Sequence, residues 1–206
     1  MPMDKWDKCE FAVCEDDLEG RVCYGGLDLS STTDITAFVL VFPPEDENDK
    51  YIILPYFWIP EDNLDIRVRR DHVPYDVWER QGFLQTTEGN VVHYGYIEKF
   101  IESLGERFNI REIAFDRWGA VQMVQNLEGM GFTVVPFGQG FKDMSPPTKE
   151  LMKLVLEQRI AHGGHPVLRW MMDNIFIRTD PAGNIKADKE KSTEKIDGAI
   201  ANIMGI

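Results

Sequence analysis

The chain has 206 residues, 43% of them hydrophobic and 28% charged, which fits one globular domain and excludes two domains of ordinary size. No apolar run approaches the roughly 20 residues that span a bilayer, and the first residues lack a signal-peptide pattern, so we expect an intracellular protein without a membrane partner. The formal net charge is −13, but carboxylates that bind metal ions count as negative until the ions arrive, so this charge does not exclude a nucleic-acid partner.

The N-terminal half begins with an irregular segment and continues with strands. Residues 1–20 have no clear periodicity and are predicted to be an N-terminal arm or a linker remnant, with 21–206 as the folded domain. Residues 22–42 indicate a strand that ends at Asp28, a turn rich in Ser and Thr, and an antiparallel strand. The aromatic and β-branched run 51–59 predicts a third strand. A carboxylate at the end of a buried strand needs a cation or hydrogen-bond donors beside it, although Asp also serves ordinary turns.

Helices and strands alternate through the middle of the chain. Pro60 is expected to open a helix, and residues 75–81 a second short one that Gly82 ends. From Tyr96 the alternation predicts parallel strands joined by helical crossovers. The elements expected there are a helix from Tyr96, a strand over 110–116, a helix over 120–130, a strand over 132–137 and a helix over 148–160 capped by Ser145.

The C-terminal part combines a hairpin and a helix. Asp-Pro and Gly-Asn punctuate two extended runs within 174–188, which predicts a β-hairpin. A final helix is expected to begin near Ser192 or Thr193, which would place Asp197 about one turn inside it.

These elements predict an α/β fold with a mixed five-stranded sheet flanked by helices, plus the added hairpin. If the strands that end in Asp28 and Asp116 are neighbours, both carboxylates emerge at one sheet edge, and the last helix could bring Asp197 there. Three carboxylates in one place repel one another unless a divalent cation is present, and oxygen ligands select Mg²⁺ or Mn²⁺. Two such ions would support phosphodiester cleavage.

Five blocks of this sequence, in order, resemble the C-terminal nuclease domain of tailed-bacteriophage terminase large subunits. They are GGLDLSSTTDITA, AFDRWGA, GQGFKDMSPP, HGGHPVLRWMMDN and KIDGAIANIM. The resemblance implies a ribonuclease H-like fold and a metal-dependent DNA endonuclease that cuts phage DNA during genome packaging. It also implies that Asp28, Asp116 and Asp197 are the catalytic metal ligands. Implied partners are double-stranded DNA, a packaging ATPase domain, the terminase small subunit and the portal, in the cytoplasm of the infected bacterial host.

Two departures from the family pattern leave alternatives open. The chain has no G-x-x-x-x-G-K-S/T phosphate loop, so it resembles the nuclease half alone, and a fourth acid has only Asp34 and Asp188 as candidates. A strand, an aspartate and a Ser/Thr-rich hairpin also occur in actin-like or sugar-kinase nucleotide-binding domains, although these proteins need two such domains. In a third interpretation, the acids are only caps and surface charges of a catalytically silent binding module.

A basic run lies between the hairpin and Asp197 in this acidic chain. The bland interpretation is a solvated face, and the functional one is a strip that guides DNA phosphates beside the metal ions. The four candidate DNA-contacting residues are Lys186, Lys189, Lys191 and Lys195.

Overall fold

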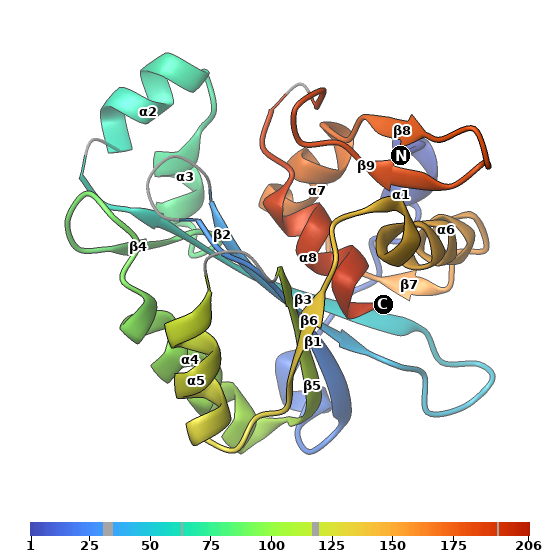
Figure 1. The fold of residues 1–206 in the computed structure, drawn as a ribbon, viewed down its shortest axis with the longest axis horizontal. Helices are drawn as coiled ribbons and strands as arrows, with labels where there is room; N and C mark the ends of the chain where they lie inside the picture. Colours follow the sequence, from blue (N-terminus) through green and yellow to red (C-terminus); the bar gives the residue numbers. More distant parts are fainter. Residues whose placement is uncertain (31–34, 63, 117–119, 193) are drawn as a thin grey trace.

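A seven-stranded mixed sheet forms the centre of the computed structural model, which describes residues 1–30, 35–62, 64–116, 120–192 and 194–206. Six strands lie in the order β4-β3-β2-β1-β5-β6, and β7 pairs with β3. Helices cover both faces, with α4 and α5 on one side and α6, α7 and α8 on the other (Figure 1). The strands are β1 (Val22–Asp28), β2 (Thr36–Phe42), β3 (Tyr51–Pro60), β4 (Gln85–Thr87), β5 (Asn109–Asp116), β6 (Val134–Phe137) and β7 (Ile160–Ala161).

The helices and a separate hairpin complete the fold. Strands β8 (Ile177–Thr179) and β9 (Ile185–Ala187) pair antiparallel with each other, as predicted for this segment. None of the helices among the described residues is long and apolar enough to cross a membrane. The helices are α1 (Met3–Asp7), a 3-10 turn at Glu15–Leu18, α2 (Leu64–Asp71), α3 (Tyr75–Arg80), α4 (Tyr94–Arg107), α5 (Val121–Gly129), α6 (Phe141–Leu156), α7 (Pro166–Asp173) and α8 (Asp197–Gly205).

Strand β1 is the centre of the sheet, with an antiparallel neighbour in β2 and a parallel neighbour in β5. This confirms that the strands ending in Asp28 and Asp116 are adjacent. Side chains alternate across a strand, so Leu27 packs with Phe115 in the core below α4, while Gly26 and Asp28 face α8.

Helix α8 packs against β1 at backbone distance. All nine of its residues are buried, and Asp197 and Asn202 are the polar ones among otherwise apolar or small residues. Gly26 makes the close approach possible, because a Cβ atom there would overlap the carbonyl oxygen of Ala201 and lie 2.8 Å from its carbonyl carbon. The N-terminal end of α8 is thereby held against the carboxyl end of β1.

The sheet and several helix boundaries differ from the sequence-based expectations. Seven strands are present instead of five, because β4 and β7, with three and two residues, are too short to produce a periodic pattern. Pro60 ends β3 instead of opening a helix. The last helix begins at Asp197, so this residue is its first, not one turn inside.

The prediction for α6 was wrong at both ends. The helix runs from Phe141 to Leu156, and Pro146 and Pro147 lie inside it. Ser145 is not a cap, since its hydroxyl accepts a hydrogen bond from the backbone N–H of Ile185 at 3.0 Å. The helix therefore supports the β8-β9 hairpin.

Residues 1–18 pack onto the body of the protein. The Trp6 ring is completely buried and stacks on His162, with 4.2 Å between the ring centroids and 5° between the planes. Asp7 accepts two hydrogen bonds of 2.8 Å from Arg169 of α7. The hydrophobic core on the α6–α8 side of the sheet includes Trp6 and Cys9.

Candidate active site

Asp28 and Asp116 lie side by side at the carboxyl ends of neighbouring parallel strands. Leu27 pairs with Phe115 in the register of β1 and β5, so the next residue of each strand is one of these two acids. Because register partners in parallel strands point to the same face, both carboxylates belong to the face that α8 covers. Asp28 is almost fully buried, with 4% of the residue exposed.

Asp197 meets this edge from the first turn of α8. It is 3% exposed, and it is the first residue of that helix. The ammonium of Lys189 joins it to β1, with Nζ 3.0 Å from Asp197 Oδ1 and 2.6 Å from Asp28 Oδ2. Two acids from segments 169 positions apart thus share one cation.

The electrostatics show how crowded with negative charge this edge is. Burial raises the pKa of Asp28 to about 7, the charges of Asp197 and Asp116 add to the rise, and Lys189 opposes it. Burial works to lower the pKa of Lys189, but the charges of Asp28 and Asp197 outweigh it and raise that pKa. One ammonium therefore only partly offsets the three carboxylates.

The backbone that follows Asp28 is held by hydroxyl groups. The Ser30 N–H donates to Thr36 Oγ1 at 3.0 Å, and the Tyr94 hydroxyl donates to the Ser30 carbonyl at 2.9 Å. Thr36 and Ser30 are both buried. Strand β2 and helix α4 thus fix the end of β1, and with it the direction of the Asp28 side chain.

Two cavities flank Lys189. One of about 270 Å³ is lined by Lys189, Ser192 and Asp197, among others. The second, of about 300 Å³, is lined by Lys189 together with Asp116, Lys186 and Asp188. The Lys189 side chain belongs to both walls, and it is still 46% exposed.

The donor set fits hard divalent cations, because carboxylate oxygens are the ligands that Mg²⁺ and Mn²⁺ prefer. Burial is the main cause of the raised Asp28 pKa, and a divalent ion would relieve the part that the charges of Asp197 and Asp116 add. In the ranges that the structure describes, however, no three Asp, Glu, His or Cys side chains already converge into a cage that could hold an ion. Asp28, Asp116 and Asp197 would have to close around it.

The candidates for a fourth acid have different outcomes. Asp34 lies outside the described residues. Asp188 is buried, and its Oδ1 accepts hydrogen bonds from the N–H groups of Glu190 and Lys191 at 3.0 and 3.3 Å. Asp188 therefore stabilises the turn that follows it. It also lines the larger flanking cavity, so its role as a fourth metal ligand stays a hypothesis.

The four lysines of the basic run do not form one strip. Lys189 contacts the acids, an ion-pair role that the sequence pattern did not indicate. Lys186 donates to the Gln139 carbonyl at 3.3 Å and lines the larger flanking cavity. Lys191 is exposed above the Phe176 ring, and Lys195 lines the smaller flanking cavity. Their contact with DNA remains a prediction.

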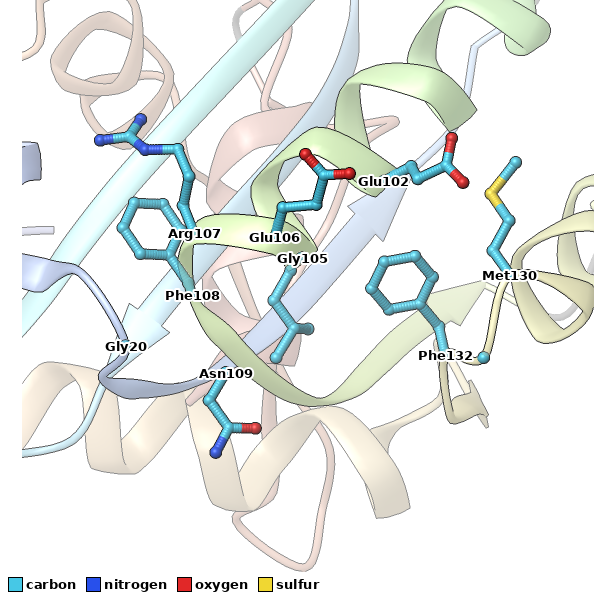
Figure 2. A pocket seen from close by; sticks show the side chains of 11 residues that line it. Gly20, Glu102, Gly105, Glu106, Arg107, Phe108, Asn109, Met130 and Phe132 are labelled. Carbon is cyan, nitrogen blue, oxygen red and sulfur yellow. The ribbon is translucent and has the colours of Figure 1, made fainter.

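A further cavity lies elsewhere, at the amino ends of β1 and β5. Its volume is about 590 Å³, and Figure 2 shows Glu102 and Glu106 of α4 on one side with the Phe132 ring opposite. The Arg107 guanidinium is bound to Glu15 and Glu19 at 2.8 and 2.7 Å. This cavity contains none of the three predicted acids, and binding sites of such sheets occur at the other, carboxyl end of the strands.

Comparison with known proteins identifies the family. The family model for the terminase large subunit, endonuclease domain, matches residues 1–206. This chain belongs to that family. The terminase resemblance seen in the five sequence blocks is thus confirmed, and the actin-like alternative is set aside. The ribonuclease H-like mixed sheet is the fold of this terminase nuclease domain.

Two curated relatives are similar over most of the chain. The terminase large subunit of Enterobacteria phage HK97 is 41% identical over 188 residues, which are 90% of this chain and 37% of the relative. Protein YmfN of Escherichia coli K12 is 28% identical over 210 residues, 98% of this chain and 46% of the relative. The chain therefore spans less than half the length of these relatives.

Solved structures of terminases have the same fold. The HK97 bacteriophage large terminase superposes with a TM-score of 0.90 at 38% identity, over 100% of this chain and 42% of that chain. The large terminase nuclease of thermophilic phage G20c with bound magnesium gives a TM-score of 0.58 at 12% identity, over 91% of this chain and 82% of that chain. At this low identity the similarity shows the fold alone.

Proposed function

We propose that this terminase nuclease domain is a divalent-metal-dependent DNA endonuclease that cuts phage DNA during genome packaging. The observation that carries the proposal is the meeting of Asp28, Asp116 and Asp197 at the carboxyl edge of the sheet, where charge crowding calls for a cation. Family membership supports the reaction class, and the G20c nucleases solved with bound magnesium, cobalt and zinc support divalent ions as cofactors. We propose two Mg²⁺ or Mn²⁺ ions in this chain.

Each acid has a role that follows from its element. Asp28 lies between Asp116 on β5 and Asp197 on α8, so the three carboxylates would hold the ions at this edge, with Asp28 as the central ligand. Bound ions supply the chemistry of two-metal hydrolysis, in which a water is activated and the leaving oxygen is stabilised. The rigid end of β1, held through Ser30 and Thr36, keeps the shared carboxylate in place.

We base the proposed substrate and partners on the family to which the chain belongs. Double-stranded DNA would lie over the edge of the sheet where Lys186 and Lys195 line the cavities beside the acids. A packaging ATPase domain, the terminase small subunit and the portal would direct the cut in the cytoplasm of the infected host. The phosphate loop of an ATPase is absent from this chain, so we expect it to cut DNA without turning over ATP.

A plasmid nicking assay tests the proposal. Purified protein is incubated with supercoiled plasmid and Mn²⁺ or Mg²⁺, and we expect nicked and linear products that a chelator abolishes. Asp28→Asn is the matched variant, because it keeps the shape of the side chain and removes its charge. Nicking by Asp28→Asn at the unmutated rate would show that the site is wrongly placed. Metal-independent DNA binding without cleavage would favour the silent binding module.

A further inference from the structure

Lys189 holds the position between the acids that a cation would need. Its ammonium lies 2.6 Å from Asp28 Oδ2 and 3.0 Å from Asp197 Oδ1, so it uses one oxygen of each carboxylate. Both carboxylates are buried, with side-chain exposures of 5% and 4%. A metal ion held by these two acids would need the space between them that the ammonium fills.

Apart from these two contacts with the acids, the Lys189 side chain is not enclosed by the protein. Its side chain is 46% exposed, and the residue belongs to the turn between the β8-β9 hairpin and α8. The flanking cavities, about 270 and 300 Å³, have the Lys189 side chain as a common wall, and Asp197 lines one while Asp116 lines the other. Withdrawal of this one side chain would free the space beside Asp28 and Asp197 that its ammonium fills.

We propose that Lys189 is an internal competitor for the metal: its ammonium neutralises Asp28 and Asp197 when no ion is bound and must leave when a divalent ion enters. This inference rests on the proposed metal-dependent function. An ammonium and a divalent cation repel each other at contact distance, so both cannot occupy the acid pair together. The lysine keeps the buried acids compensated without metal, and it lowers the apparent metal affinity.

Metal binding measured by calorimetry separates this competitor role from a supporting one. Mn²⁺ is titrated into the unmutated protein, Lys189→Met, which keeps the chain length without charge, and Lys189→Gln, which keeps a polar end. We expect both variants to bind Mn²⁺ at least about tenfold more tightly, because a charge-assisted contact no longer has to break. Lys191→Met is the matched control, since Lys191 is an exposed lysine of the same turn, and we expect no change in its affinity.

Melting curves give a second readout that does not depend on cleavage. Without metal, Lys189→Met should melt below the unmutated protein, because two buried carboxylates lose their cation. Mn²⁺ should then raise its melting temperature more than it raises that of the unmutated protein. Equal or weaker Mn²⁺ affinity in both Lys189 variants would overturn the inference, as would a complete lack of Mn²⁺ binding in all proteins.

The two proposals fail in different ways. If the unmutated protein nicks plasmid with Mn²⁺ but the Lys189 variants bind the ion no better, the nuclease function stands and the competitor role is refuted. If the Lys189 variants bind Mn²⁺ more tightly but no protein nicks plasmid, the competitor role stands and the nuclease function is refuted.

Discussion

Gly26→Ala tests whether backbone packing between β1 and α8 positions the acids. The added Cβ would overlap the Ala201 carbonyl oxygen and lie 3.1 Å from the Gly205 backbone nitrogen. These are backbone atoms of a fully buried helix, so α8 has to move away from the sheet. Overpacking of this kind costs roughly 1 to 3 kcal/mol, partly offset by about 0.5 to 1 kcal/mol because Ala suits a strand better than Gly.

The expected net loss from Gly26→Ala is therefore about 1 kcal/mol, which lowers the melting temperature of a domain of this size by roughly 2 to 4 °C. A shift of α8 by about 1 Å would misplace Asp197 and could cost on the order of a hundredfold in cleavage. Differential scanning fluorimetry and plasmid nicking measure the two effects. Gly95→Ala in α4 is the control, because no atom lies within 4 Å of its Cβ position; it should leave cleavage unchanged and should not lower the melting temperature, since Ala suits a helix better than Gly.

The reasoning about α8 would be refuted if Gly26→Ala melted within about 1 °C of the unmutated protein and cut plasmid at the same rate. A lower melting temperature with normal cleavage would support close packing of α8 on β1. It would contradict the idea that this packing positions the acids for cleavage. Both results are independent of whether Lys189 competes with metal.

Four further predictions concern individual side chains. Asp28→Asn, Asp116→Asn and Asp197→Asn should each severely reduce plasmid nicking, with residual Mn²⁺-dependent activity only for Asp197→Asn. Since the folded-state pKa of Asp28 is raised to about 7, ionising it costs stability as pH rises from about 4 to 7, so metal-free Asp28→Asn should melt at or above the unmutated protein at pH 7.5. Trp6→Ala should cost about 3 to 5 kcal/mol in urea unfolding, because the ring is fully buried; a loss under about 1 kcal/mol would mean that residues 1–20 are a detachable arm. Burial lowers the pKa of His165 to about 4, so the unfolded state binds more protons below about pH 6.5 and the stability of the fold should fall from there to pH 4. His165→Phe should reduce this dependence of stability on pH. An unchanged dependence would contradict the role given to His165.

The strand framework was accessible from the sequence because its signals are local. Alternating and β-branched runs marked β1, β2 and β3, and the helix–strand alternation after Tyr96 correctly implied a parallel β5. Both Asp28 and Asp116 end such runs, so their common edge followed from the adjacency of two strands. Residue type and strand end were sufficient to predict these two acids.

The remaining features depend on contacts between distant segments. Strand β7 pairs with β3 through two residues, and each of them lies more than 100 positions along the chain from its partner in β3. The stacking of Trp6 on His162 joins residues 156 positions apart, and nothing in residues 1–20 reveals it. Lys189 was grouped with its neighbours in a charge run, since the sequence gives no sign that its ammonium reaches Asp28, 161 positions away.

The position of Asp197 follows from packing more than from its own helix. Ile196 precedes the helix with no side-chain cap, so local capping does not fix where α8 begins. What fixes it is the burial of all nine α8 residues, together with the gap left by Gly26 for the Ala201 backbone. The distance between Asp28 and Asp197 therefore depends on the contact between Gly26 and Ala201. Gly26 lies two residues before Asp28, and Ala201 lies four residues after Asp197. A substitution confined to this contact can move Asp28 and Asp197 relative to each other without changing either carboxylate. Its effect on cleavage therefore measures the placement of the acids separately from the loss of a metal ligand.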